Sequence, residues 1–203
     1  ASGLATLVGK DAIVTRLADI VEKARKTNEN YRQQKVEKRR MELSFAITGD
    51  AGTRKTTIAN AIAQELYQAG IVKKPVPETI TPLNYDNYVK DLDKNIQSVG
   101  NSVLVIDEAE KLVPEGQAVD VASIDYILSP LRQWKYDKEK PVVIFIGGQS
   151  LAEYFRNNPK SKAIVNYFIE TKPQDVNDLV EITRRILFID HHLALSDEAL
   201  AKL

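Results

Sequence analysis

The first element visible in the pattern of apolar and polar positions is an amphipathic helix near the N-terminus. Apolar residues recur at helical spacing, at Ile13, Leu17, Ile20, Val21 and Ala24, and the chain then stays strongly polar through residue 40. This pattern predicts a helix that packs one face on a core, followed by a solvated helical extension or loop, together occupying residues 11–40.

Five short segments farther along have the composition of strands. Three are almost wholly apolar, as a strand buried on both faces must be (residues 43–48, 102–106 and 141–146), and two are more mixed (78–83 and 167–170). Helical patterns separate them, with Ile58, Ala61, Ile62 and Leu66 on one face before Gly70, and further helices at residues 124–134 and near 152–157. The alternation predicts an α/β fold: a doubly wound, mainly parallel five-stranded sheet covered on both sides.

The last part of the chain predicts two more helices. One begins at Asp175, and the second begins in LSDEAL (residues 195–200), where Ser196 is the expected cap. We therefore assign residues 1–190 to one large α/β subdomain and residues 191–203 to the beginning of a second helical element.

Composition narrows the classes of function. The 28 basic and 28 acidic residues give a formal charge of +0, so bulk charge does not support nucleic-acid or membrane binding, and no apolar run has membrane-spanning length. The start ASGLATLVGK lacks the pattern of a signal peptide, so the cytoplasm is the expected compartment. The chain has no cysteine, which excludes thiolate chemistry, and the pair His191–His192 is read as a surface or helix-end feature rather than a metal site.

The basic run KVEKRR at residues 35–40 has two interpretations. It could be a nucleic-acid patch, but an acidic residue interrupts it and the overall charge is balanced, so we interpret it as a solvated face.

Residues 49–57, GDAGTRKTT, resemble a phosphate-binding loop in which Arg54 replaces the glycine of the pattern G-x-x-x-x-G-K-S/T. A strand that turns into a helix aims backbone N–H groups and the helix N-terminus at one point, which suits a phosphate. Lys55 is expected to reach the β and γ phosphates of a nucleotide, and the Thr56 hydroxyl to bind Mg²⁺. The candidate nucleotide-binding residues are Gly49, Asp50, Ala51, Gly52, Thr53, Arg54, Lys55, Thr56 and Thr57.

Two carboxylates follow the strand at residues 102–106. Asp107 is the candidate contact to Mg²⁺, and Glu108 is the candidate catalytic residue that polarises a water for attack on the γ-phosphate. Acidic pairs at strand ends are also common turn residues. The loop and this pair together predict an NTP-binding domain.

The chain as a whole resembles the CbxX/CfqX group of AAA+ ATPases, which includes red-type rubisco activases, a sporulation ATPase and the ATPases of type VII secretion. The resemblance rests on LVGKDAIVTRL (7–17), GDAGTRKTTIANAIAQELYQAGIV (49–72), SVLVIDEAEKLV (102–113), PVVIFIGGQSLAEYFRNNP (141–159) and LSDEAL. It implies an ASCE-type sheet, Mg-ATP as ligand with Val8 and Gly9 also at the nucleotide, and residues 191–203 as the start of a helical lid. It further implies a homo- or hetero-oligomeric ring that acts on a protein or other macromolecular client. Gln149 is then either a sensor of the γ-phosphate or an ordinary surface glutamine.

The sequence departs from this family at several functional positions. The stretch KSKAIVNYF (160–168) holds no arginine where the family places the finger that reaches a neighbour's nucleotide, and Lys162 is a poor substitute because an ammonium lacks a planar fork. Tyr88 to Lys90 are at most a remnant of the family's pore loop, so Tyr85 and Tyr88 are read as packing or surface aromatics. Arg54 either adds attraction for the triphosphate or occupies the anion site itself; we expect weakened affinity and little hydrolysis by this domain alone.

Two functional hypotheses therefore stay open. The first is an ATP hydrolase that remodels a client, and the second is a degenerate scaffold or regulatory subunit that completes its sites only beside an active partner. A DNA-acting protein is disfavoured by the balanced charge.

Overall fold

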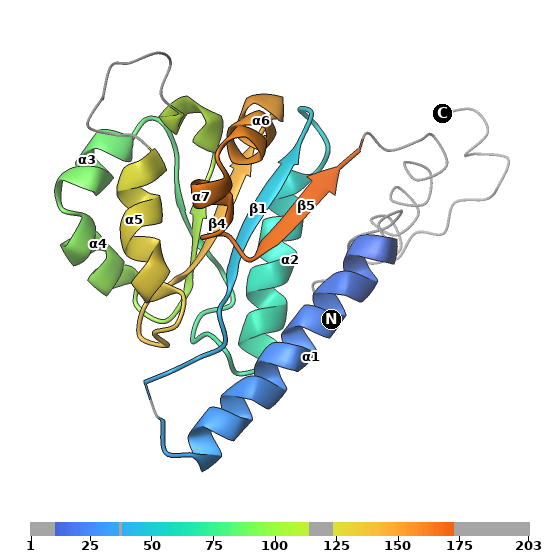
Figure 1. The fold of residues 1–203 in the computed structure, drawn as a ribbon, viewed down its shortest axis with the longest axis vertical. Coiled ribbons are helices and arrows are strands. Elements are labelled where there is room, and N and C mark those ends of the chain that lie inside the picture. The colour runs from blue at the N-terminus through green and yellow to red at the C-terminus, as the bar shows by residue number, and fades with distance from the viewer. Residues whose placement is uncertain (1–10, 37, 114–123, 173–203) are drawn as a thin grey trace, which may run out of the picture.

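A five-stranded parallel sheet forms the centre of the computed structural model, which describes residues 11–36, 38–113 and 124–172. The strands are β1 (Ser44–Gly49), β2 (Glu78–Ile80), β3 (Val103–Ile106), β4 (Val142–Gly147) and β5 (Tyr167–Thr171). Their order is β2-β3-β4-β1-β5, and every pairing is parallel. Figure 1 shows β1 between β4 and β5, and in this register Ile47 lies opposite both Ile146 and Ile169. The predicted α/β sheet is thus confirmed, and β4 separates β1 from β3.

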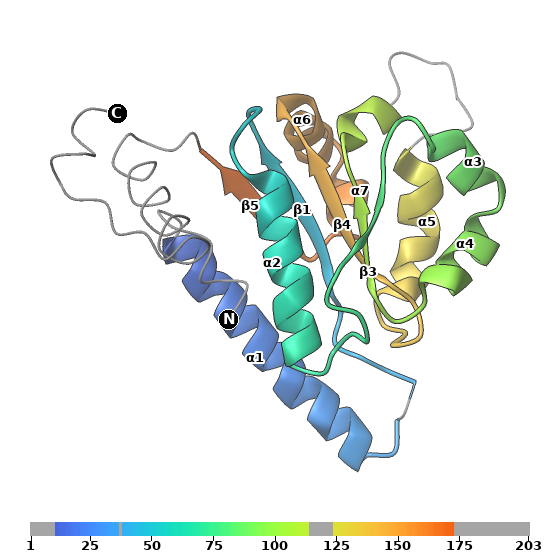
Figure 2. The ribbon, with the colours of Figure 1, turned by 180° about the vertical axis from the view of Figure 1, so that it is seen from behind.

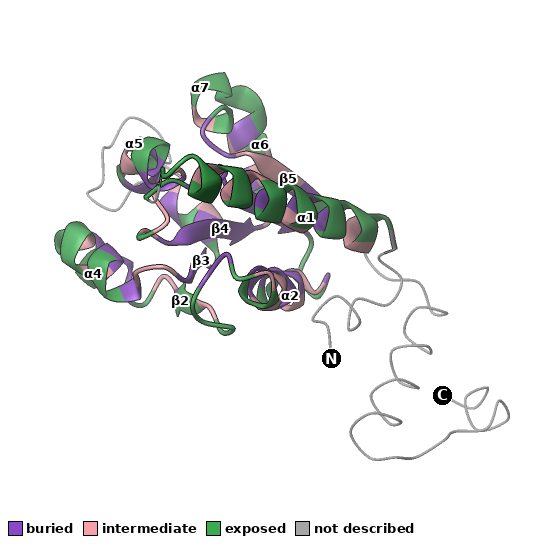
Figure 3. Ribbon diagram, turned by 90° about the horizontal axis from the view of Figure 1, so that it is seen from below, coloured by how far each residue is buried: buried purple, intermediate pink, exposed green. Residues whose placement is uncertain are grey.

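Helices cover both faces of this sheet, as a doubly wound fold requires. The long α1 (Asp11–Gln33) and α2 (Lys55–Gln68) pack against one face (Figure 2). Phe45 and Ile47 of β1 share a core cluster with these two helices. The other face carries the helices α3 (Tyr85–Lys90), α4 (Leu92–Val99), α5 (Ile124–Trp134) and α6 (Gln149–Asn157). Figure 3 shows the burial that results: β3 and β4 are purple, whereas α1 turns exposed residues outward. The near-continuous apolar runs of the central strands follow from burial on two faces.

The predicted elements differ from the structure mainly between residues 78 and 99. The second strand covers Glu78–Ile80 rather than residues 78–83, and the pattern did not reveal α3 and α4. Both helices are short and are separated by Asp91, whose φ of −122° and ψ of 44° break the helical geometry. The buried residues of each helix are therefore too few to show a helical period in the sequence.

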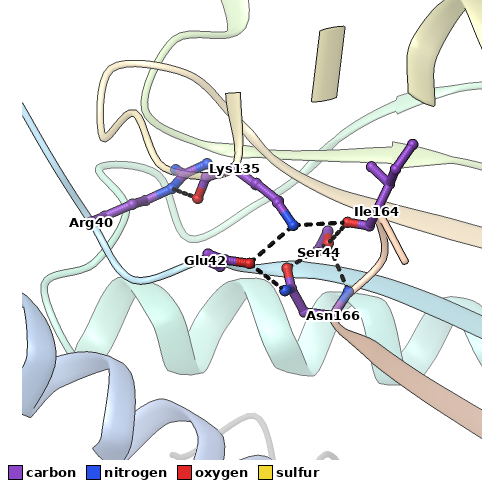
Figure 4. Close-up of polar contacts among 6 residues, drawn as sticks. All are labelled: Arg40, Glu42, Ser44, Lys135, Ile164 and Asn166. Carbon is purple, nitrogen blue, oxygen red and sulfur yellow. Dashed lines mark hydrogen bonds and ion pairs between the residues drawn. The ribbon is translucent and has the colours of Figure 1, made fainter. Parts of the chain in front are cut away.

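One residue of the basic run 35–40 contradicts its interpretation as a solvated face. Helix α1 ends at Gln33, and Arg40 is 1% exposed. Its guanidinium donates to the carbonyl oxygens of Trp134, Lys135, Lys140 and Pro141 at 2.7–3.3 Å (Figure 4 shows the bond to Lys135). Burial lowers the pKa of Arg40 to about 10, with the charge of Asp137 acting the other way, so the side chain is cationic at neutral pH. Four carbonyl groups thus replace water around this cation, which charge counting could not foresee.

Several predictions concern positions outside the described residues. These are Val8 and Gly9, the helix from Asp175, the boundary at residue 190, the lid at residues 191–203, and His191 with His192.

Candidate functional site

The loop between β1 and α2 is attached to the end of β5. Gly49, the last residue of β1, has a φ of +150°, and a Cβ there would lie 2.5 Å from the carbonyl oxygen of Thr171, so only glycine fits this approach. The Thr53 hydroxyl lies 2.5 Å from the Thr171 hydroxyl and donates to the carbonyl oxygen of Asp50 at 2.7 Å. These contacts fix the curvature of the loop before α2 begins.

A pocket of about 810 Å³ lies at the carboxyl ends of β1, β3 and β4, beside this loop. It brings together every predicted site residue that the structure describes. Its lining consists of residues 49–57, Asp107, Glu108, Glu110, Ile146, Gly147, Gly148 and Gln149. Parallel strands direct their carboxyl ends to one edge of the sheet, and ligand sites of open α/β sheets form there.

Lys55 is folded back toward its own loop. Its ammonium donates to the carbonyl oxygens of Gly49 at 2.8 Å and of Asp50 at 2.6 Å. These bonds hold a half-buried positive charge beside the helix N-terminus, where the backbone also favours an anion. Thr56, one residue farther along α2, is exposed, so its hydroxyl is accessible.

Arg54 caps α2 in a left-handed conformation, with φ of 60° and ψ of 31°. A glycine would adopt this geometry without strain, whereas an arginine pays roughly 1–2 kcal/mol for it. The Nη1 atom of its guanidinium is buried and has no hydrogen-bond partner among the residues that the structure describes. A buried cationic N–H group without an acceptor, in a pocket that also holds Lys55, fits an anionic ligand such as a phosphate.

Asp107 and Glu108 lie where β3 ends, and their surroundings differ. The backbone N–H of Glu108 donates to Asp107 Oδ1 at 2.9 Å, and the Tyr85 hydroxyl donates to the Asp107 carbonyl oxygen. Glu108 itself has a φ of 49°, and its half-exposed carboxylate pairs with Lys111 one turn on. The hydrogen bond that the Lys111 ammonium donates to the Glu108 carboxylate raises the pKa of Lys111. The candidate catalytic carboxylate, Glu108, therefore lies at the surface of the pocket in an ion pair with Lys111.

Glu110 is a pocket residue that the sequence reasoning missed. Its Oε2 atom is buried and has no hydrogen-bond partner in the described part of the chain, and a Cβ on Gly147 would lie 2.5 Å from it. In the sequence, the position of Glu110 three residues after Asp107 was the one indication that it belongs to the site. That spacing brings Glu110 to the pocket because the chain forms the 3-10 helix η2 (Ala109–Leu112) at this point.

Magnesium would find few protein ligands here. Within the described parts of the chain, no three His, Cys, Asp or Glu side chains are grouped as a metal cage. Mg²⁺ keeps most of its waters and needs only one or two protein oxygens, so the Thr56 hydroxyl and Asp107 are a donor set that fits it.

The remaining predicted functional positions are the sensor candidate, the substitute for the arginine finger and the remnant of the pore loop. Gln149 is exposed at the first residue of α6 and lines the pocket. Lys162 ends α7 (Pro159–Lys162), with its ammonium 5.9 Å from the centre of the Phe168 ring. Tyr85, Tyr88 and Val89 are buried in α3, so in this structure the tyrosines are packing residues rather than part of a protruding loop.

The sheet order, the loop between β1 and α2, and the carboxylates after β3 together define a P-loop NTPase fold. Residues 45–158 match the family described as "ATPase family associated with various cellular activities (AAA)". Because the match covers more than half of the 203 residues, the chain belongs to the AAA family.

Known relatives and structures agree with this membership. The chain is 27% identical to the ATP-binding subunit ClpC of the ATP-dependent Clp protease from Staphylococcus epidermidis, and 26% identical to ClpC of Staphylococcus aureus strain USA300. Each alignment covers 96% of this chain but only 23% of ClpC, so the chain spans about a quarter of these relatives. These relatives support the AAA family, and the CbxX/CfqX group stays a prediction.

Two solved structures show the same fold. A mutant of Thermotoga maritima RuvB superposes with a TM-score of 0.60 at 17% identity, covering 94% of this chain and 55% of RuvB. A chain of the HORMA:CdnC:Trip13 complex of E. coli MS115-1 superposes with a TM-score of 0.62 at 14% identity, covering 98% and 74%. Among the residues described, no helix has the length and apolar character to cross a bilayer.

Proposed function

We propose that this chain binds Mg-ATP in the pocket beside the loop and couples the nucleotide state to remodelling or assembly of a protein client, within a homo- or hetero-oligomeric ring in the cytoplasm. The observation that carries the proposal is the convergence of Lys55, the unpaired Arg54 guanidinium and Asp107 in one pocket. A triphosphate with its magnesium is complementary to that set of charges. The resemblance to the CbxX/CfqX group supports the ring and the client.

In this proposal each residue has a separate task. Lys55 and the loop N–H groups bind the β and γ phosphates, and Thr56 with Asp107 holds Mg²⁺, which neutralises phosphate charge. Glu108 would accept a hydrogen bond from the attacking water after its ion pair with Lys111 opens. Val8 and Gly9 are proposed to lie at the nucleotide on the basis of the resemblance, and Gln149 to sense the γ-phosphate.

Arg54 is proposed to act as an additional phosphate ligand. Of the two alternatives raised by the sequence, the buried and unpaired Nη1 favours attraction, since an acceptor such as a phosphate oxygen would satisfy it. This proposal replaces the expectation, drawn from the sequence, that Arg54 weakens the affinity for nucleotide. Calorimetric titration with Mg-ATP tests this for the chain and for Arg54→Gly. We expect affinity to fall about ten-fold in Arg54→Gly, the effect of one charge-assisted hydrogen bond. Tighter binding by Arg54→Gly would instead mean that Arg54 obstructs the anion site.

A second candidate function is a scaffold or regulatory subunit without turnover of its own. Specific observations favour it: Glu108 is paired with Lys111, residues 160–168 hold no arginine, and Lys162 lies against Phe168. Phosphate release from ATP separates the two functions. The remodeller predicts turnover by the chain alone that Glu108→Gln abolishes, and the regulatory subunit predicts turnover only in a mixed ring with an active partner subunit.

A further inference from the structure

We propose that Glu110 makes nucleotide binding in this pocket dependent on Mg²⁺, by disfavouring a bare triphosphate and accepting a hydrogen bond from a water that the ion holds. This inference rests on the proposed function, and it concerns a residue that neither the phosphate loop nor the pair Asp107–Glu108 includes.

The position of the carboxylate is set by packing on both sides of it. Ala109 and Leu112, the first and last residues of η2, are 0% and 3% exposed, and they anchor this turn in the core. Glu110 then reaches the carboxyl end of β4, where Gly147 and Gly148 have no side chains. A Cβ would lie 2.5 Å from Oε2 if added at Gly147, and 3.7 Å from Oε1 if added at Gly148. The carboxylate therefore occupies the space that a side chain at Gly147 would need, and it lies in contact distance of Gly148, at the end of the strand between β1 and β3.

The pocket contains two buried atoms of opposite charge that lack partners. Within residues 11–36, 38–113 and 124–172, Glu110 Oε2 has no donor and Arg54 Nη1 has no acceptor. Burial without a partner is costly for both, and no ion pair within 4.0 Å joins them. A ligand that satisfies both must offer an anionic oxygen to Arg54 and a donor or a cation to Glu110. A phosphate with hydrated Mg²⁺ offers both, because the ion retains its waters.

The neighbouring Glu108 does not need a donor or a cation from the ligand. Its carboxylate is half exposed and already pairs with Lys111, so its charge is compensated before any ligand arrives. A bare triphosphate in the pocket would instead meet the Glu110 carboxylate, whose Oε2 has no hydrogen-bond partner among the described residues. Like charges in a partly buried site repel strongly, and a divalent cation between them reverses the sign of the interaction.

The experiment is a calorimetric titration of the full chain with ATP, performed once with excess Mg²⁺ and once with EDTA. The measured quantity is the ratio of the dissociation constant in EDTA to that in Mg²⁺. We expect Glu110→Gln to lower this ratio about ten-fold, because affinity rises without the ion and falls with it. Glu110→Ala removes the same charge without an amide to accommodate and should act alike. Glu153→Gln, on the exposed side of α6, is the control that should keep the wild-type ratio.

The outcomes separate this inference from the function on which it depends. If the wild-type chain binds ATP with a Mg²⁺-dependent ratio that Glu110→Gln and Glu110→Ala leave unchanged, the inference is wrong and the nucleotide site stands. A wild-type ratio near one overturns it in the same way. If the wild-type chain binds no ATP under either condition, the proposed function fails, and this inference with it. A purely structural role for Glu110 would change both dissociation constants in the same direction and leave their ratio intact.

Discussion

The Lys55 ammonium lies 2.8 Å from the carbonyl oxygen of Gly49, so the first residue of α2 is tied to the last residue of β1. With a second bond to Asp50 at 2.6 Å, two of the three donors of this ammonium are used within the loop. The third is available to a phosphate oxygen. Lys55 therefore both shapes the loop and carries its charge.

Replacing Lys55 should separate these two roles. In Lys55→Met we expect the affinity for Mg-ATP to fall at least ten-fold, since a charge-assisted hydrogen bond is lost. The free energy of unfolding should change by less than about 1.5 kcal/mol, because the two internal bonds lie at a half-buried site. Calorimetry and urea unfolding measure the two quantities. Lys74→Met, at an exposed position, is the control, and equal affinities in the two variants would show that the pocket is not a phosphate site.

The backbone at Arg54 should respond to glycine and alanine in different ways. Both substitutions remove the guanidinium, but alanine keeps the strain of a left-handed residue at φ 60° and glycine relieves it. Glycine also has more entropy in the unfolded chain, and this offsets part of the strain that it relieves. We therefore expect the unfolding free energy of Arg54→Gly to exceed that of Arg54→Ala by about 0.5–1 kcal/mol. Urea unfolding of both variants measures the difference. An Arg54→Ala protein as stable as Arg54→Gly would mean that the left-handed conformation is absent in solution.

The fold and most of the pocket lining could be predicted from the sequence because their signals are local. The loop, its flanking strand and helix, and Asp107 occupy contiguous segments whose residue types dictate their structure. Arg40 and Glu110 were not readable, because their roles depend on residues about a hundred and about forty positions away, the carbonyl groups near Lys140 and the bare Gly147. The helices α3 and α4 were missed for another reason: neither is long enough to show a helical period.

Arg40 should be a large contributor to stability despite its position in a basic run. Arg40→Met leaves the four carbonyl groups that it contacts without their donor, and we expect a loss of about 3–5 kcal/mol in unfolding free energy. Arg40→Lys should recover little of it, since a single ammonium cannot span the same acceptors. The adjacent Arg39 is the matched control: it is exposed and stacks on the rings of Tyr31 and Tyr136, so Arg39→Met should cost less than about 1 kcal/mol. Similar losses for Arg40→Met and Arg39→Met would contradict the assigned role.

Glu42 links β1 to the segments before β4 and β5, and this linkage should make stability depend on pH. Its carboxylate pairs with Lys135 at 2.9 Å and accepts from Asn166 at 2.8 Å, while Ser44 donates to Asn166 at 2.8 Å (Figure 4). Burial opposes ionisation, but hydrogen bonds from Tyr136, Lys135 and Asn166 outweigh it, so the pKa of Glu42 is held below its ordinary value of 4.5.

The sign of the effect follows from that direction. A carboxyl group whose pKa is lowered on folding stabilises the protein above its unfolded pKa, and this stabilisation is lost as the pH falls through the folded value. We therefore expect wild type to lose more unfolding free energy than Glu42→Gln between pH 7 and pH 3.5. The difference should stay below about 1 kcal/mol, because 37% of the side chain is exposed and solvent screens the pair. Urea unfolding at the two pH values measures it, with Glu153→Gln as control. Equal acid sensitivity of wild type and Glu42→Gln would mean that the ion pair with Lys135 contributes nothing to the folded state.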